Sequence, residues 1–451
     1  MKETKFKQTE VGMIPSDWEV KTLGELVDMS SGTTPSRFNE KNFQGNVCWL
    51  SSGELKSHYI YNTKEKISEA AASTMRLYPK GTVVIAMYGL EAEGVRGTSS
   101  ILAKECTISQ ACMAFTNLRK INNEFFYYWY AANGDEIGTR YAQGTKQQNL
   151  SPEVMKNVVI PLPPTIKEQQ RIANTLSDVD ALINNLEKLI AKKKNIKQGA
   201  MQQLLTGKKR LPGFGSDERQ KECHSERSAK REVEESSGYK MTELGLIPSD
   251  WENVNISKTC TIKARIGWQG LKSTEYLNSG DYILVTGTDF KNGFIDWSTC
   301  SYVSEWRFKQ DKNIQIKKGD VLVTKDGTIG KVAFLNEIPM EGTLNSGVFV
   351  VRSKDLKKID SVYLSLVFKS SWFDNFLDEI TSGSTIVHLY QKDFVKFNFP
   401  IPSSIEEQTA IANVLSDMDT EISALETKLA KYRTLKTGMM QQLLTGKIRL
   451  A

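Results

Sequence analysis

The chain has 451 residues, of which 39% are hydrophobic and 25% charged, and this is enough for two or three domains with cores of their own. No apolar run approaches the roughly 20 residues of a membrane helix, and the first residues lack the apolar stretch of a secretory signal. We therefore expect a soluble protein that stays in the cytoplasm. The formal net charge of +6 permits nucleic-acid binding without requiring it, because a local basic face matters more than the total.

The six cysteines point to neither a metal site nor a disulfide framework. They form no C-x-x-C pair and have no partnered histidine spacing. We expect inert, buried thiols and no metal at Cys48, Cys106, Cys112, Cys223, Cys260 and Cys300.

An internal repeat sets the organisation of the chain. Residues 11–19 return as residues 244–252, and residues 161–211 return as residues 400–450, with more than half of the aligned positions identical in the second pair. The stretches between them, 20–160 and 253–399, are about equally long but mostly disagree in sequence. The chain is thus a tandem duplication, in which one scaffold is used twice and carries two different inserts.

The first insert belongs to a domain that we place at residues 1–158. Residues 81–87 are an apolar strand candidate that begins with glycine and ends in the turn Tyr88-Gly89. Residues 125–130, which are all aromatic, indicate a buried helix rather than a platform for base stacking. A mixed, strand-rich domain is expected.

The helix that follows is expected within residues 159–211. Thr165 and Glu168 fit a capping box, and Gly207 stands where a helix would end. Between them the apolar residues recur at alternating steps of three and four, which is a heptad seam: Leu176, Val179, Ile183, Leu186 and Ile190.

Residues 212–239 are rich in charge and poor in apolar residues, and we expect a flexible linker there. The second domain, at residues 240–397, repeats the pattern of the first. Residues 319–324 are a glycine-bounded strand candidate with the turn Lys325-Asp326-Gly327, and residues 363–368 indicate a buried helix.

The last segment, residues 398–451, predicts a second long helix with a capping box at Ser404 and Glu407. Its heptad seam matches the first: Leu415, Met418, Ile422, Leu425 and Leu429. So narrow a seam is suited to packing against one partner helix, and the simplest partner is the helix of the other repeat. The linker is long enough for the chain to return antiparallel along the first helix, so that the two helices would form a rod of roughly 60 Å. Gly199 and Gly438 interrupt both helices, which predicts a close backbone approach or a break. The expected fold is α+β, with two mixed strand-rich domains joined by an antiparallel intramolecular coiled coil in a pseudo-two-fold tandem repeat.

Three motifs, each present twice, carry a resemblance to a known family. They are the Ile-Pro-x-Asp-Trp opening, the Pro-x-Pro segment followed by Glu-Gln-x-x-Ile-Ala, and the Gln-Gln-Leu-Leu-Thr-Gly end. With these motifs the whole chain resembles the specificity subunit of type I restriction-modification systems. The positions are Ile14 to Trp18 and Ile247 to Trp251; Pro161, Pro163, Glu168, Gln169, Ile172, Ala173 and Pro400, Pro402, Glu407, Gln408, Ile411, Ala412; and residues 202–207 and 441–446.

The resemblance implies a division of labour between this chain and its partners. Residues 1–158 and 240–397 would be target-recognition domains, and residues 159–211 and 398–451 the conserved spacer helices. The partners would be double-stranded DNA, two modification (adenine methyltransferase) subunits and up to two restriction (translocase and nuclease) subunits. S-adenosylmethionine, ATP and magnesium would then bind in those partners, with no cofactor in this chain.

The duplication accounts in physical terms for the function that the resemblance implies. A duplicated scaffold offers one docking surface twice, and unlike inserts predict unlike half-sites in a split, asymmetric DNA target. We find no phosphate-binding loop and no methyltransferase tetrapeptide, and the nuclease-like string at residues 17–21 loses its lysine in the repeat, where Val254 stands. We expect no catalytic site. The alternative is a coiled-coil scaffold without base-specific reading.

Candidate DNA contacts are loop residues that differ between the halves. Arginine and glutamine can read base edges in the major groove, whereas lysine and threonine more often hold phosphates. The candidates are Arg37, Tyr88 and Arg96 in the first domain, and Arg265, Trp268, Gln269, Lys325, Thr328 and Lys331 in the second.

Overall fold

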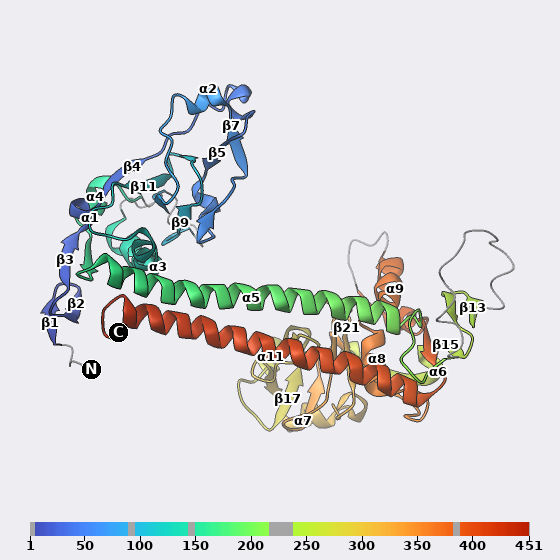
Figure 1. The fold of residues 1–451 in the computed structure, drawn as a ribbon. Helices are drawn as coiled ribbons and strands as arrows, with labels where there is room; N and C mark the ends of the chain where they lie inside the picture. Colours follow the sequence, from blue (N-terminus) through green and yellow to red (C-terminus); the bar gives the residue numbers. More distant parts are fainter. Residues whose placement is uncertain (1–4, 89–94, 143–148, 216–237, 382–387, 451) are drawn as a thin grey trace, which may run out of the picture. The chain divides into compact units, whose positions relative to one another are not determined.

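The computed structural model describes residues 5–88, 95–142, 149–215, 238–381 and 388–450. The chain divides into two compact units, Met1–Leu189 with Leu425–Ala451, and Ile190–Ala424. Each unit contains one strand-rich domain and a part of both long helices (Figure 1). Both helices therefore contribute to both units. Of the expected linker at 212–239, residues 216–237 lie outside the described residues.

Two sheets form the first domain. The larger has the strand order β4-β11-β8-β9-β6, and the smaller has the order β10-β5-β7. All four residues of β8, the strand expected at 81–87, are buried in the larger sheet. The strands are β4 (Asp28–Ser31), β5 (Val47–Leu50), β6 (Tyr59–Ile60), β7 (Glu65–Ile67), β8 (Val83–Ala86), β9 (Ser99–Leu102), β10 (Thr107–Ile108) and β11 (Cys112–Thr116).

Scaffold strands that recur in both halves hold the two ends of this insert together. β3 (Glu19–Thr22) pairs antiparallel with β12 (Val159–Leu162), although the insert separates them. A hairpin of β1 (Phe6–Thr9) and β2 (Gly12–Pro15) precedes them. Because the ends of the insert lie side by side, its sequence can vary without disturbing the scaffold. Short helices complete the domain: α1 (Leu23–Leu26), η1 (Glu40–Phe43), η2 (Ser52–Glu54), α2 (Glu69–Ala72) and α4 (Pro152–Lys156).

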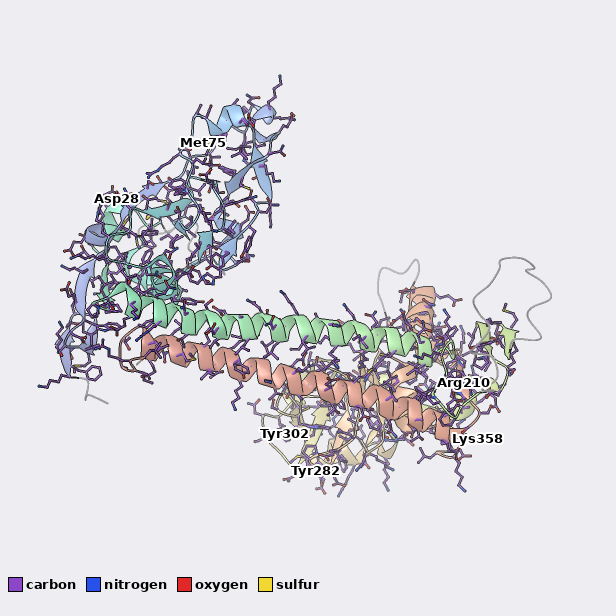
Figure 2. The ribbon with its side chains drawn as sticks, in the orientation of Figure 1. Asp28, Met75, Arg210, Tyr282, Tyr302 and Lys358 are labelled. Atoms are coloured by element: carbon purple, nitrogen blue, oxygen red, sulfur yellow. The ribbon has the colours of Figure 1, made fainter. Side chains whose placement is uncertain are left out.

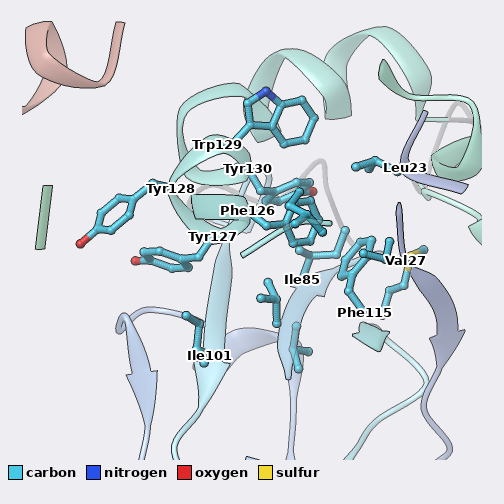
Figure 3. Close-up of a cluster of buried hydrophobic side chains, with 14 of the residues drawn as sticks. Leu23, Val27, Ile85, Ile101, Phe115, Phe126, Tyr127, Tyr128, Trp129 and Tyr130 are labelled. Carbon is cyan, nitrogen blue, oxygen red and sulfur yellow. The ribbon is translucent and has the colours of Figure 1, made fainter. Parts of the chain in front are cut away.

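The aromatic run at 125–130 lies on α3 (Asn123–Tyr141), and all six side chains are buried. Figure 3 shows these rings packed over the larger sheet, against residues such as Ile85 and Phe115. Phe115 and Phe126 meet edge to face, with ring centroids 4.8 Å apart. The expected buried helix is confirmed.

The second domain repeats the arrangement of strands in the first. Its larger sheet has the order β16-β24-β21-β22 and its smaller sheet the order β20-β17-β23. In both domains the central strand of the smaller sheet has one parallel and one antiparallel neighbour. The strands are β16 (Cys260–Ala264), β17 (Tyr282–Val285), β20 (Ser301–Val303), β21 (Val321–Thr324), β22 (Val332–Phe334), β23 (Gly342–Leu344) and β24 (Val348–Ser353).

The second insert is also closed by scaffold strands, because β15 (Trp251–Asn255) pairs antiparallel with β25 (Asn398–Pro402). The helix expected at 363–368 is α8 (Ser361–Val367), and its buried residues confirm it as core. The remaining elements are β13 (Tyr239–Thr242), β14 (Gly245–Pro248), α6 (Ile256–Thr259), η4 (Gly267–Gln269), η5 (Ser273–Glu275), η6 (Gly287–Asp289), β18 (Phe290–Lys291), β19 (Phe294–Ile295), α7 (Glu305–Lys309), η7 (Lys312–Ile314), α9 (Ser371–Thr381) and α10 (Gln391–Phe394).

The two long helices are α5 (Ile166–Leu204) and α11 (Ile405–Leu443), each of 39 residues. In the first unit Asp180 pairs with Lys436 at 2.6 Å and Glu187 with Arg433 at 2.6 Å. In the second unit Lys193 pairs with Glu421 and Lys197 with Asp419. Within each unit the partner numbers fall along α11 as they rise along α5, so the pairing is antiparallel, as expected.

The seam residues lie at the contact between these helices. Leu176, Val179, Ile183 and Ile190 are buried on α5, as are Leu415 and Ile422 on α11. Leu186, Met418, Leu425 and Leu429 are half-buried. The expected α+β fold with a paired-helix repeat is confirmed.

One local expectation for the helices was wrong, and another is confirmed only in part. α5 and α11 continue through Gly199 and Gly438, and a Cβ at either glycine would meet no atom within 4 Å. There is therefore neither a break nor a close approach. The capping boxes form only in part: the hydroxyls of Thr165 and Ser404 accept from the amides of Glu168 and Glu407, but the two carboxylates bind arginines instead.

Among the described residues, no helix is both long and apolar enough to cross a membrane. Five cysteines are free and buried: Cys48, Cys106, Cys112, Cys260 and Cys300. Cys223 lies outside the described residues.

Candidate DNA interface

The first candidate reader, Arg37, lies in the loop that precedes the central strand β5. Its guanidinium donates two hydrogen bonds to Glu65 at the start of β7, at 2.9 and 2.8 Å, and it lies 4.5 Å above the ring of Phe43. The hydrogen bond to Arg37 lowers the pKa of Glu65. A guanidinium that donates two hydrogen bonds to a carboxylate must break them before it can form a bidentate contact with guanine. In this structure Arg37 therefore stabilises the loop, and we call its pair with Glu65 a brace.

The second domain braces the matching loop with the charges reversed. Here the loop before β17 supplies the acid, Glu275, and α7 supplies the base, Arg307, with distances of 2.7 and 2.9 Å. The hydrogen bond to Arg307 lowers the pKa of Glu275 to about 2. Two divergent sequences thus hold the same loop with one bidentate pair. No expectation from the sequence covered this brace, since its partners are about 30 residues apart.

The expectation that Arg265 and Gln269 read base edges needs correction. Arg265 is only 1% exposed, and its guanidinium donates to the carbonyl oxygen of Leu344 at 2.9 Å and to Thr343 Oγ1 at 3.1 Å. Burial, followed by the nearby charge of Arg307, lowers its pKa. Gln269 is also buried. Neither side chain reaches a base without rearrangement. The side chain of Trp268 lies outside the described residues, so its role stays a prediction.

Tyr88 and Arg96 flank residues 89–94, which the structure does not describe. Both side chains are half-buried. Arg96 donates to Thr139 Oγ1 at 3.2 Å, and its stem covers Gly138 on α3, where an added Cβ would approach Arg96 Cγ to 2.6 Å. Arg96 therefore has a packing role, and DNA contact by both residues stays a prediction.

The turn after β21 presents the remaining candidates. Thr324 fixes it, since its hydroxyl donates to the carbonyl oxygen of Thr328 and accepts from the amide of Lys331. Thr328 and Lys331 are exposed, whereas Lys325 is half-buried with its ammonium 5.3 Å from the ring of Phe349. A rigid turn with an exposed lysine and hydroxyl suits phosphate contact, and it stays a prediction.

One ion pair between the long helices recurs in both units, at matching positions of the two repeats. In the first unit Tyr128 donates to Asp180 at 2.9 Å, and Asp180 also pairs with Lys436. In the second unit the equivalent pair is Asp419 and Lys197. There, burial and the charge of Lys197 lower the pKa of Lys369 to about 8. The same helix ion pair thus accepts a hydrogen bond from Tyr128 in the first unit and acts on the charge of Lys369 in the second.

A second repeated contact closes each unit beyond the helix ends. Arg449 binds Glu168 and Asp17 in the first unit, and Arg210, labelled in Figure 2, binds Glu407 and Asp250 in the second. All of these residues stand in the repeated segments, so a comparison of charged positions between the repeats was the signal that could have found them. Within the described part of the chain, no group of His, Cys, Asp or Glu could hold a metal ion.

Comparison with known protein families shows which proteins this chain resembles. A model described as the type I restriction modification DNA specificity domain matches twice, at residues 15–198 and 248–431. The chain is 25% identical over its whole length to the type I restriction enzyme MjaVIII specificity subunit of Methanocaldococcus jannaschii, of which it covers 97%. It is 23% identical to the EcoBI specificity subunit of Escherichia coli, over 73% of this chain and 66% of that protein.

The fold is shared with a solved structure. The crystal structure of the S subunit of a type I restriction-modification system from M. genitalium matches with a TM-score of 0.57 and 17% identity, over 98% of both chains. Together with the two matched domains, which span most of the sequence, this settles the expected family. The chain belongs to the family of type I restriction-modification specificity subunits, the DNA-reading members of these systems, which are not themselves catalytic.

Proposed function

We propose that this chain reads two unlike DNA half-sites, one with each recognition domain, and so directs adenine methylation and restriction by its partners to a bipartite, asymmetric target. The observation that carries the proposal is the contrast between constant and variable parts. The strand order and the ion pair between the long helices recur, while the residues on the loops differ, down to the reversed charges of the Arg37 and Arg307 braces. A scaffold without base reading would not need two divergent domains.

We also propose two modification subunits and up to two restriction subunits as partners. The duplication supports this, since a repeated surface binds one partner twice. Ile196 on α5 in the second unit and Leu435 on α11 in the first stand at matching positions of the two repeats, and both are exposed. An exposed apolar side chain that recurs in both repeats suits a partner that binds twice.

Methyl transfer and DNA cleavage would then rest on S-adenosylmethionine, ATP and magnesium bound by those partners. The absence of a phosphate-binding loop and of a methyltransferase tetrapeptide from the sequence supports this assignment. Because the proposed target is genomic DNA, we propose the cytoplasm as the location.

A domain exchange tests the proposal. Residues 20–158 are replaced by the corresponding domain of another specificity subunit, and the methylated motif is determined in cells that also carry the modification partner. We expect one half-site to change and the other to stay. The pairing of β3 with β12 makes the exchange feasible, because both junctions lie side by side. A change of both half-sites together would contradict independent reading.

A further inference from the structure

Several aromatic side chains of the described residues are exposed, among them Tyr61, Phe294 and Tyr390, but two of them lie beside the arginines that brace the recognition domains. Phe38 is fully exposed, at 104% of its reference area, and Trp306 is 66% exposed. Burial of such a side chain stabilises a fold by about 1.5–3 kcal/mol, and neither ring contributes that here. Single exposed hydrophobic residues are common on protein surfaces, and the position of these two residues is what distinguishes them.

Each ring is the sequence neighbour of a brace arginine. Phe38 follows Arg37, which is fixed by Glu65 and by the ring of Phe43. The same loop is tied again, because the side chain of Asn42 donates to the carbonyl oxygen of Ser36 at 2.9 Å. The exposed ring therefore projects from a preorganised segment, and little conformational entropy would be lost when it binds.

Trp306 precedes Arg307 on α7 and is held in the same manner. Phe308 on this helix is buried and stacks on Tyr282, with ring centroids 4.2 Å apart; Figure 2 labels Tyr282. The guanidinium of Arg307 lies 4.8 Å from the Trp306 ring while it binds Glu275. One aromatic residue thus anchors α7 in the domain, and the other points outward.

We infer that Phe38 and Trp306 are base-contacting residues that pack their rings against the bases of the first and second half-site, respectively; this rests on the proposed DNA-reading function. DNA offers an apolar ring two surfaces, the thymine methyl in the major groove and the base faces exposed when a step opens. Carboxylates occupy both brace arginines, which leaves the neighbouring exposed rings to make the contact with DNA.

The placement favours DNA over a protein partner. A partner that binds twice would contact features that recur in the repeated scaffold, whereas both rings lie in the inserts, where the sequences disagree. The rings also differ in kind, phenyl in one domain and indole in the other, as expected for unlike half-sites.

The test uses the assembled methyltransferase and a duplex that contains its methylated motif. Phe38→Ala is expected to weaken binding of this duplex roughly tenfold, by the scale of base–aromatic contacts, and Trp306→Ala likewise. Two probes are used: deoxyuridine in place of each thymine of a half-site, which removes one methyl group, and 2-aminopurine in place of a base beside each step, which fluoresces more when the step unstacks. For the wild type, we expect that one deoxyuridine lowers the binding affinity or that one 2-aminopurine becomes more fluorescent on binding. Phe38→Ala should abolish this response in the first half-site only. Trp306→Ala should do so in the second only.

Leu77→Ala in the first domain and Leu356→Ala in the second are controls, since both leucines are exposed and neither lies beside a brace. Thermal melts establish that all variants are folded. If the wild-type complex discriminates its motif from other duplexes, but the alanine variants bind like the controls, or lose both half-sites equally, the inference is overturned. If the wild type itself does not discriminate, the proposed function fails instead.

Discussion

Arg449 donates its Nη1 hydrogens to both carboxylate oxygens of Asp17, at 2.8 Å each, although 432 residues separate the two along the chain. Its Nε and Nη2 bind Glu168 at the start of α5. In the second unit Arg210 repeats this pattern with Asp250 and Glu407. Each recognition domain is thus closed by an arginine that follows the long helix of the other repeat.

The two arginines should differ in their contribution to stability. Glu407 is 2% exposed and Glu168 12% exposed. Removal of Arg210 leaves a fully buried carboxylate without its partner, so we expect Arg210→Ala to lower the free energy of unfolding by about 3–5 kcal/mol, and Arg449→Ala by less. Denaturant unfolding of the purified chain measures both. Arg433→Ala, which breaks an exposed pair with Glu187, is the control and should cost under about 1 kcal/mol. Equal effects of all three substitutions would contradict this ranking.

Replacement of glycine by alanine should have opposite effects on stability at the repeated ends and inside the long helices. Gly446 has φ +68°, and a Cβ there would lie 2.5 Å from Pro15 Cγ. Gly446→Ala is therefore expected to lower the melting temperature. Gly438→Ala is the matched variant in open space within α11, and it should stabilise by about 0.5–1 kcal/mol because alanine favours the helix. A close backbone approach at Gly438 would make that variant destabilising.

Lys369 gives the second unit a pH-dependent stability. Burial, then the charge of Lys197, lowers its pKa to about 8 from 10.5, while Asp419 acts in the opposite direction. Between these two values the unfolded chain binds more protons than the folded chain, so stability rises with pH across this window. Below pH 8 the ammonium is charged in both states and its half-buried site is unfavourable. Lys369→Met should therefore raise the melting temperature at pH 7, with an advantage that shrinks towards pH 10.5. The exposed Lys318→Met is the control. An advantage that grows with pH would refute the assignment.

Arg265 is expected to act on stability rather than on base choice. Arg265→Ala leaves the Leu344 carbonyl and the Thr343 hydroxyl without their buried donors, which should cost about 1–3 kcal/mol of unfolding free energy for each group left unsatisfied. The folded fraction of the Arg265→Ala protein should keep the wild-type preference among DNA targets that differ at a single base pair. Binding assays with the assembled methyltransferase measure this preference. Relaxed selectivity at one base, without loss of stability, would return Arg265 to the list of readers.

Lys331→Ala should weaken binding of all DNA sequences to a similar degree, since an exposed lysine on the turn fixed by Thr324 suits a phosphate contact. The slope of the logarithm of the binding constant against the logarithm of the salt concentration should become about one unit less steep. A change confined to one base position would contradict this role.

The repeat made the scaffold predictable from the sequence. Heptad spacing identified the seam from Leu176 to Ile190, and glycine-bounded apolar runs located β8 and β21. The polar contacts were harder to foresee, because they depend on residues brought together by the fold. Arg265 stands in a loop and carries a charge, which favours exposure, yet the fold turns it towards β23. Arg37 lies in a loop, as expected, but its pairing with Glu65 cannot be derived from local sequence. Phe38 was overlooked, because nothing in the sequence distinguishes an exposed phenylalanine from a buried one.

We propose, above all, that one chain carries two independent DNA readers. Genome-wide mapping of methylated adenines, in cells that carry this chain and its modification partner, tests it most directly. We predict a single motif of two unlike half-sites, separated by unspecified bases, with one methylated adenine on each strand. A continuous motif, two identical half-sites, or no modified motif in cells that contain the assembled complex would contradict it.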